Sequence, residues 1–394
     1  MNYGSGRAAI IVLDGLGIGP APDSAAYGDA GSDTLGNVAR AVGGLHLPNL
    51  EKLGLGRCRA SGLTGVASSA TPMAAHGIAQ PASAGKDSTT GHWEICGVLL
   101  EQAFRTYPDG FPVALLNEFG ARTGRGWIGN KAASGTAIID ELGAEHQRTG
   151  KWIVYTSADS VFQVAAHEGT VQLAELYEAC GVARAMLRGE HAVSRVIARP
   201  FEGTPGSYER TAHRKDFSIA PIGTTLLDLM ADGGVERVGI GKVDDLFAGR
   251  NIASEHTPTN ADAFRLIERA FDRLETGFVF VNVIEFDQTW GHRNDVAGFH
   301  RGLQELDAWI PRLVARLRPD DLVILTADHG NDPTTPSTDH SREVVPILVL
   351  GPKVQPVALG VRRTFADMGQ TVAEYFGLPA LSAGTSFLRS VFAS

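Results

Sequence analysis

Three aspartates in this sequence each follow an apolar run with the composition of a buried β-strand. The runs and their aspartates are residues 8–13 before Asp14, 278–286 before Asp287 and 322–327 before Asp328. In an open α/β sheet, ligands bind beyond the carboxyl ends of the strands. We therefore expect three carboxylates to converge at one edge, although any one of them alone would more often cap a turn or a helix.

A histidine accompanies each part of this pattern. His329 directly follows Asp328 in TADHGND, His292 lies in DQTWGHR after Asp287, and His340 ends PSTDH before another apolar run. Because the chain has only 12 histidines, capping explains the set poorly. Six carboxylate and imidazole groups suit two divalent ions of Mn, Zn or Fe, with Mg less natural beside histidine. The sequence therefore predicts a two-metal centre.

A run of hydroxyl residues offers a nucleophile for such a centre. Two metals about 3.5 to 4 Å apart hold the attacking and leaving oxygens of an in-line phosphoryl transfer. The segment GKDSTTGHWE places Ser88, Thr89 and Thr90 beside Lys86. We expect a helix to begin here, where free N–H groups favour a phosphate. Alone, the same run is most often a helix cap.

Two nucleotide-binding patterns are not met. A P-loop ending at Lys86 would need Gly at position 80 and a hydroxyl at 87, where Gln80 and Asp87 stand. The segment GLGIGP at residues 15–20 lacks the third glycine of a dinucleotide loop at its spacing and runs into proline. ATP binding of the Walker type and NAD binding are therefore disfavoured.

The ligands come from both ends of the chain, so the ends must form one core. We predict an α/β core from residues 1–100 and 221–394, with an inserted domain at residues 101–220. Expected core helices are residues 261–274 and 298–317, and 345–350 is a further core strand. The insert is expected to contain strands at 152–155 and 194–198 and a helix at 171–187.

The composition limits the class of protein. At 394 residues, with 43% hydrophobic and 20% charged residues, the chain suits a globular α/β enzyme. Its net charge of −9 disfavours general binding to nucleic acid or anionic membranes. Three cysteines without a CxxC pair indicate neither a disulfide framework nor a thiolate metal site. Without a signal-peptide core or a membrane span, we expect a soluble cytoplasmic protein, and its oligomeric state is not indicated.

Several motifs together resemble one family. They are VLDGLGIGPAPD with GSDTLGN, GKDSTTGHWE, YTSADSV, RVIARPF, TADHGNDPTTPSTDH and GTSFL. With these motifs spread over nearly the whole chain, it is similar to the phosphopentomutases of the alkaline phosphatase superfamily. The resemblance implies an alkaline-phosphatase-like α/β core with a mostly parallel sheet, a smaller inserted α+β cap, and interconversion of ribose or deoxyribose 1-phosphate with the 5-phosphates.

The resemblance also implies roles for individual residues. Two Mn²⁺ ions, replaceable by Mg²⁺, Zn²⁺ or Co²⁺, would be held by one group of Asp287, His292 and His340 and another of Asp14, Asp328 and His329. The nucleophile would be Ser88, where members of the family carry threonine. Ser157 and Asp159 would bind sugar hydroxyls, and Arg195, Arg210 and Lys242 would hold the distal phosphate, the arginines through their bidentate fork. A sugar 1,6-bisphosphate would prime the enzyme.

Other functions share parts of this pattern. A phosphatase or sulfatase of the same superfamily would have the same metal centre, and ribose 1-phosphate distinguishes it by release of phosphate. A cofactor-independent phosphoglycerate mutase fits the YTSADSV and GKDST segments less well. A non-catalytic sugar-phosphate sensor would bind metal and ligand without exchanging a phosphoryl group.

Overall fold

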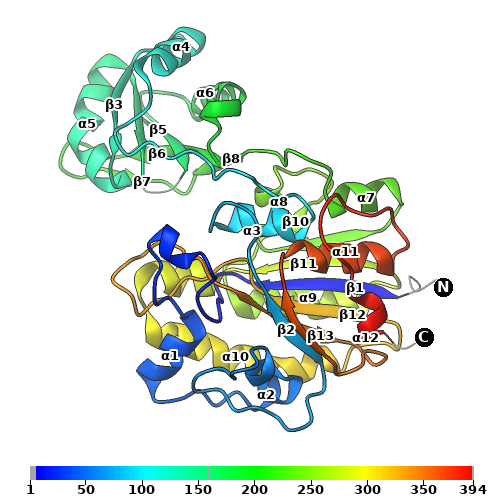
Figure 1. Ribbon diagram of the computed structural model, residues 1–394. Coiled ribbons are helices and arrows are strands. Elements are labelled where there is room, and N and C mark those ends of the chain that lie inside the picture. The colour runs from blue at the N-terminus through cyan, green and yellow to red at the C-terminus, as the bar shows by residue number, and fades with distance from the viewer. Residues whose placement is uncertain (1–5, 158–159, 393–394) are drawn as a thin grey trace. The chain divides into compact units, whose positions relative to one another are not determined.

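The computed structural model describes residues 6–157 and 160–392 of the chain. It divides into two compact units. The first unit runs up to Ala103 and resumes at Pro221, and the second runs from Phe104 to Ala220 (Figure 1). The two ends of the chain therefore belong to one unit, as a shared set of ligands requires.

An eight-stranded sheet forms the centre of the first unit. Its order is β10 (Ser254–Glu255), β9 (Arg237–Ile240), β11 (Gly277–Val283), β1 (Arg7–Leu13), β12 (Leu322–Thr326), β13 (Val345–Leu350), β2 (Ala75–Ala79) and β14 (Ala358–Arg362). Among the described strands of this sheet, β13 alone runs against its neighbours. The predicted α/β class with a mostly parallel sheet is thus confirmed.

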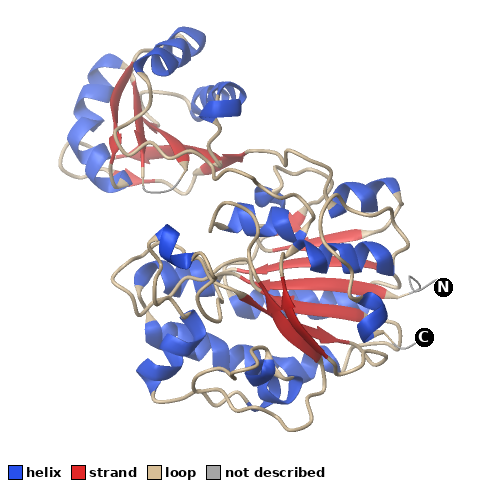
Figure 2. Cartoon of the chain, in the orientation of Figure 1, coloured by secondary structure: helices blue, strands red, loops and turns tan. Residues whose placement is uncertain are grey.

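Helices cover both faces of this sheet (Figure 2). They are α1 (Thr34–Val42), α2 (Pro48–Leu53), α3 (Ser88–Ile95), α7 (Leu226–Asp232), α8 (Val243–Leu246), α9 (Asn260–Arg273), α10 (Val296–Val314), α11 (Ala366–Tyr375) and α12 (Leu388–Val391). Helix α10 packs with α1, α2 and α9, while α3 and α7 pack with α11. Because both faces are covered, the central strands β1, β11, β12 and β13 are buried along their whole length.

One predicted strand is longer than the observed one. The run at residues 278–286 was expected to be extended up to Asp287, but β11 ends at Val283. A π-helical turn, η4 (Phe286–Trp290), follows, and a 3-10 turn, η5 (Gly291–Arg293), continues it. The strand ends because Glu285 bonds to Asn260 instead of to a neighbouring strand. The Glu285 carboxylate accepts from the backbone N–H of Asn260 at 2.6 Å, and the backbone N–H of Glu285 donates to Asn260 Oδ1 at 3.0 Å. Asp287 therefore projects from a turn and not from a strand end.

The second unit contains a mixed six-stranded sheet with helices on both faces. Its strands are β3 (Trp127–Ala132), β4 (Trp152–Thr156), β5 (Val161–His167), β6 (Arg195–Glu202) and β7 (Glu209–Arg210), with β8 (Lys215–Ser218) also paired to β6. Alternate residues of β4 face opposite cores. Trp152 and Val154 pack with α4 (Val113–Thr123) and α6 (Leu173–Met186), whereas Ile153 and Tyr155 pack under α5 (Gly135–Thr149). None of the described helices in either unit is long and apolar enough to cross a bilayer.

Candidate metal centre

Two of the predicted ligands leave neighbouring strands at the same level. Strands β1 and β12 pair in parallel, so Asp14 and Asp328 both emerge at their carboxyl ends. The backbone N–H of Asp14 donates to Val283 of β11, and that of Gly15 donates to Asp328 Oδ1 at 3.1 Å. His329 follows Asp328, and its Nε2 lies 3.3 Å from Asp14 Oδ1. One potential ligand atom from each of Asp14, Asp328 and His329 lies within 4.8 Å of the other two.

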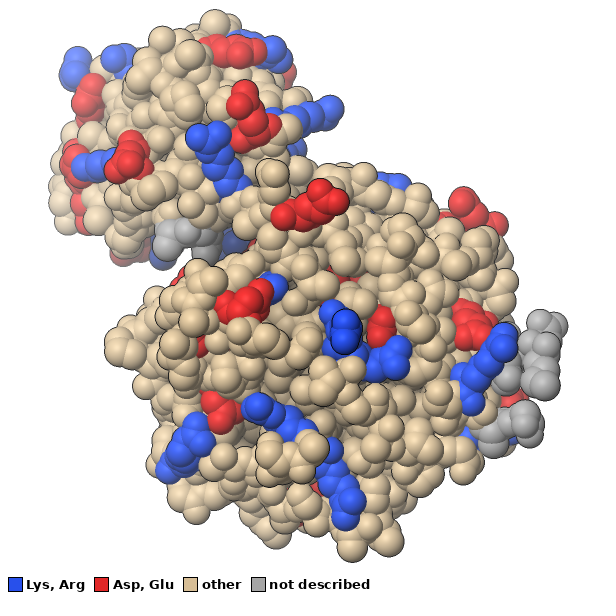
Figure 3. All heavy atoms as spheres, in the orientation of Figure 1, with Lys and Arg blue, Asp and Glu red and all other residues tan. Residues whose placement is uncertain are grey.

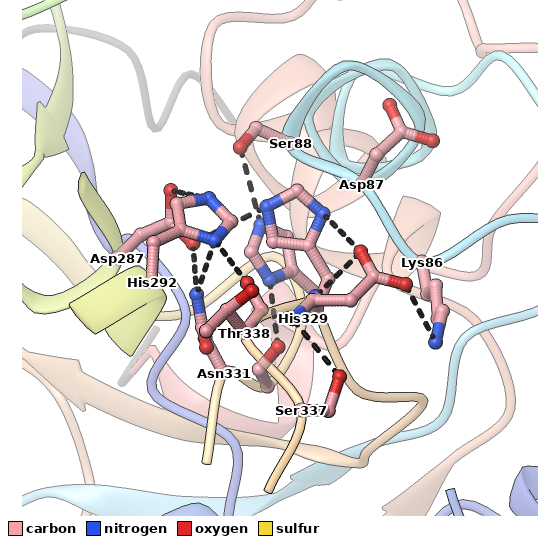
Figure 4. A network of polar contacts seen from close by, with 12 residues as sticks. Lys86, Asp87, Ser88, Asp287, His292, His329, Asn331, Ser337 and Thr338 are labelled. Atoms are coloured by element: carbon pink, nitrogen blue, oxygen red, sulfur yellow. Dashed lines mark hydrogen bonds and ion pairs between the residues drawn. The ribbon is translucent and has the colours of Figure 1, made fainter. Parts of the chain in front are cut away.

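A second group forms around Asp287 (Figure 4). His292 Nε2 lies 3.3 Å from one carboxylate oxygen of Asp287, and His340 Nε2 lies 3.3 Å from the other. The ring centroids of His292 and His340 are 4.8 Å apart, and those of His329 and His340 are 4.3 Å apart. His329 thus joins the two groups. The structure brings all six predicted ligands together in the first unit.

The chemistry of these side chains fits divalent cations. Asp328 Oδ2 and His340 Nε2 are buried and make no hydrogen bond within the described residues, although His92 Nδ1 lies 3.1 Å from the first and Asp287 Oδ1 lies 3.3 Å from the second. Three carboxylates are buried here, whereas Lys242 supplies one positive charge, with its Nζ 2.9 Å from Asp14 Oδ2. Buried charges of this kind are paired or coordinate metals. Three carboxylates therefore face two positive charges, on Lys242 and on protonated His329, which leaves ligand atoms and negative charge for a bound cation.

The buried charges of the site also shift the pKa values of His329 and Asp14. Burial opposes protonation of His329, but the carboxylates of Asp328 and Asp14 outweigh it and raise the pKa of His329 to about 10. Burial likewise raises the pKa of the Asp14 carboxyl, but Lys242 and His329 bring it below its ordinary value. A field that attracts a proton to His329 Nε2 also attracts a metal ion, which competes with the proton for that nitrogen.

The predicted nucleophile faces this set of ligands. Helix α3 begins at Ser88, and the side chain of Asp87 caps it by accepting from the backbone N–H of Thr90 at 3.1 Å. Ser88 Oγ donates to Asp14 Oδ1 at 3.2 Å and lies 3.1 Å from His329 Nε2. The hydroxyl of Thr90 donates to Asp87 at 2.6 Å, so it orders the start of the helix. Of these hydroxyls, Ser88 is the one that contacts the ligands.

Glycine allows α3 to approach the end of β12. A Cβ on Gly91 would lie 2.3 Å from the carbonyl oxygen of Asp328. One turn further from Ser88, His92 is buried, and its Nδ1 lies 2.9 Å from the Ser88 carbonyl oxygen and 3.1 Å from Asp328 Oδ2. The sequence did not single out His92, although its spacing of four residues from Ser88 on a helix is a signal that both face one way.

Asn331 is another contact that the sequence reasoning missed. Its side-chain amide donates to Asp287 Oδ1 at 2.7 Å, and its own Oδ1 is buried without a hydrogen-bond partner in the part of the chain that the structure describes. The residue belongs to TADHGND, three residues after Asp328, so its place in a ligand-bearing loop was the available signal.

The residues predicted to bind substrate are spread over both units. Lys242 lies beside Asp14 in the first unit. In the second unit, Ser157 follows β4, Arg195 begins β6 with its Nη1 3.4 Å from Asp216, and Arg210 is exposed on β7. Asp159 lies outside the described residues. Their roles in binding remain predictions.

Comparison with known proteins agrees with the motifs. The model of a family described as the metalloenzyme superfamily matches residues 6–380. A phosphopentomutase from Anaeromyxobacter sp. (strain K) is 56% identical over 387 residues, which cover 98% of this chain and 99% of the relative. A phosphopentomutase from Carboxydothermus hydrogenoformans is 53% identical over 374 residues, 94% of this chain and 96% of the relative. The chain therefore belongs to the phosphopentomutase family of isomerases, within the metalloenzyme superfamily.

Proposed function

We propose that the protein interconverts ribose or deoxyribose 1-phosphate with the corresponding 5-phosphates through a phosphorylated Ser88 and a pentose bisphosphate. One observation carries the proposal: the Ser88 hydroxyl, at the start of α3, lies within 3.2 Å of both Asp14 and His329. Free N–H groups at the start of a helix stabilise a phosphate. Ser88 is thus in a position to carry a phosphoryl group beside the proposed metal ligands.

The proposed ligands are two groups of three that fit two Mn²⁺ ions. Asp287, His292 and His340 would hold one ion, and Asp14, Asp328 and His329 the other. When bound, such ions neutralise charge on the transferring group and hold its attacking and leaving oxygens. Fit to divalent cations is supported by the buried Asp328 Oδ2 and His340 Nε2, which lack hydrogen-bond partners among the described residues.

In the proposed cycle the phosphoryl group moves twice. The bond from Ser88 Oγ to phosphorus breaks as a sugar hydroxyl forms a bond to the same phosphorus, and the proton that the sugar hydroxyl loses is balanced by one gained at Ser88 Oγ. The other phosphoryl group of the resulting bisphosphate then returns to Ser88, which regenerates the starting enzyme. A sugar 1,6-bisphosphate would supply the first phosphoryl group. The cycle balances because each phosphoryl group taken from Ser88 is replaced.

The second unit is proposed as the cap that binds the sugar and keeps water from phosphorylated Ser88. Ser157 and Asp159 are the proposed partners of the sugar hydroxyls. Arg195 and Arg210, with Lys242 from the first unit, are the proposed partners of the distal phosphate. A mutase requires such exclusion, because water would otherwise accept the phosphoryl group and the enzyme would act as a phosphatase.

The test uses ribose 1-phosphate, Mn²⁺ and a catalytic amount of glucose 1,6-bisphosphate. The wild type is expected to form ribose 5-phosphate, with a phosphate on Ser88 detected by peptide mass spectrometry. Ser88→Ala should lose both, whereas Thr89→Ala, which removes the neighbouring hydroxyl, should keep both. Full turnover by Ser88→Ala would refute the proposal, and stoichiometric release of inorganic phosphate by the wild type would identify a hydrolase instead.

A further inference from the structure

Arg342 binds the loop that leads to the nucleophile. Its side chain is 3% exposed and follows the proposed ligand His340 by two residues. The guanidinium donates to three main-chain carbonyl oxygens of the loop at residues 81–87: Ser83 at 2.6 Å, Gly85 at 2.5 Å and Pro81 at 3.1 Å. This loop ends at the N-cap of α3, directly before Ser88.

The remaining donors of Arg342 fix the orientation of its guanidinium plane. Its Nε donates to one carboxylate oxygen of Asp23 at 3.1 Å, and its Nη2 donates to the other at 2.9 Å. The guanidinium lies 4.6 Å from the centre of the Tyr27 ring. All five N–H groups of the guanidinium are therefore accounted for, with two on Asp23 and three on the 81–87 loop.

A second link joins the same two segments of chain. Lys86 Nζ lies 3.0 Å from Asp29 Oδ1 and 3.2 Å from Asp339 Oδ2, next to His340. The backbone N–H of Arg342 donates to Asp29 Oδ2 at 2.8 Å. Lys86 is thus held by two carboxylates, one of which is drawn beside it in Figure 4, and residues 339–342 are tied to the 81–87 loop at both ends.

The chemistry of the contacts makes arginine specific here. Three carbonyl oxygens and a bidentate carboxylate need five donors in one plane, which an arginine supplies and a lysine does not. The fixed positions of these carbonyl oxygens, and not their exposure, decide which side chain can bind them all. A shift of about 1 Å in a reacting group costs on the order of 10²-fold in rate. The position of the 81–87 loop, which leads to Ser88, should therefore affect the rate of phosphoryl transfer.

We propose that Arg342 is a positioning residue for the phosphoryl step, which holds Ser88 at a fixed distance from the segment that carries His340. The proposal rests on the proposed function, because it takes Ser88 as the group that carries the phosphoryl. Loosening the loop then slows transfer more than it weakens substrate binding. It also lets water compete for the phosphoryl group.

The test compares two buried arginines. In Arg342→Lys we expect kcat for the mutase to fall by about tenfold or more, with KM changed less than about twofold, and a lower ratio of ribose 5-phosphate formed to phosphate released. The matched control is Arg7→Lys. Arg7 is 1% exposed, pairs with Asp321 and donates to the carbonyl of Phe271, at the opposite end of β1 from Asp14. It should lower the melting temperature without changing the ratio.

A milder variant covers the case in which Arg342→Lys fails to fold. The side chain of Asp23 is 47% exposed, so Asp23→Asn should fold while it removes the charge that aligns the guanidinium. It should lower kcat and the product ratio in the same direction, by less. Arg342 is only structural if Arg342→Lys, or Asp23→Asn in its place, has the same kcat and the same ratio of ribose 5-phosphate to released phosphate as Arg7→Lys. Absence of phosphate on Ser88 in the wild type is the separate result that removes the proposed function.

Discussion

Replacing Lys242 tests whether cations belong beside Asp14. Its Nζ lies 2.9 Å from Asp14 Oδ2, and the side chains are 25% and 0% exposed. At an effective dielectric constant of about 20, two unit charges at this distance attract by about 6 kcal/mol. Desolvation offsets part of this, and removing one partner of a buried pair typically costs about 3 to 5 kcal/mol because the other charge stays buried.

Lys242→Met keeps most of the length of the side chain and removes its charge. At roughly 2 to 4 °C per kcal/mol, we expect it to lower the melting temperature by about 6 to 20 °C in EDTA. With saturating MnCl2 the loss should be much smaller, because bound cations would neutralise the same carboxylates. Differential scanning calorimetry under the two conditions measures the difference.

Lys353→Met is the matched control for this measurement. Lys353 pairs with Asp320 at 2.6 Å, and both side chains are at least 40% exposed. An exposed pair contributes at most about 1 kcal/mol, so the control should change little in either condition. An equal loss for Lys242→Met in EDTA and in MnCl2 would refute the reasoning, because it would mean that added cations do not reach Asp14.

Three further predictions concern other parts of the molecule. Ser88→Thr restores the residue expected in this family; its methyl group restricts χ1 and displaces water, so mutase turnover should persist while phosphate release per turnover falls. Asp307 Oδ1 accepts hydrogen bonds from the backbone N–H groups of Asn49 and Leu50, at the start of α2, at 2.9 and 2.8 Å. Asp307→Ala should therefore lower the free energy of unfolding in urea by about 2 to 3 kcal/mol without changing turnover per folded enzyme. Burial lowers the pKa of His146 below 6.5, so folding favours its neutral form. The stability of the folded protein should therefore be constant above pH 6.5 and fall below it. In thermal melts from pH 8 to 5, His146→Gln should reduce this fall in melting temperature.

The central strands could be predicted because they are buried on both faces. Such strands appear as unbroken apolar runs, and the runs before Asp14 and Asp328 end within a residue or two of β1 and β12. Burial on both faces also explains why the strand before Asp287 was predicted to be too long. Phe286 lies beyond β11 but is fully buried, with its ring 5.1 Å from that of Phe299, so the apolar pattern continues into the turn. Composition does not separate a buried strand from a buried turn.

The ligand types could be predicted, but their surroundings could not. Asp14 and His329 come from sequence positions that parallel strands bring together, so residue type and position at the end of an apolar run were sufficient. Lys242 was predicted to hold a distal phosphate, which stays a prediction; its pairing with Asp14 had no signal in the sequence and arises because the chain after β9 (Arg237–Ile240) delivers it to the same edge. Arg342 had no signal at all, since three of its acceptors are main-chain carbonyls.

The sheet explains why the carboxylates of this site lie close together. Strands β11, β1 and β12 are adjacent at the centre of the sheet, about 4.8 Å apart, so Asp14 and Asp328 are held together by the buried strands β1 and β12, and Asp287 joins them from the turn after β11. Like charges brought together in this way oppose folding, while anything that binds the folded site and neutralises them opposes unfolding. Helix α3 then adds Ser88 to the same edge, with Gly91 allowing its close approach to Asp328. Under the proposed function, stability without metal and phosphoryl transfer with metal would depend on the same carboxylates, so a change at Lys242 should alter both.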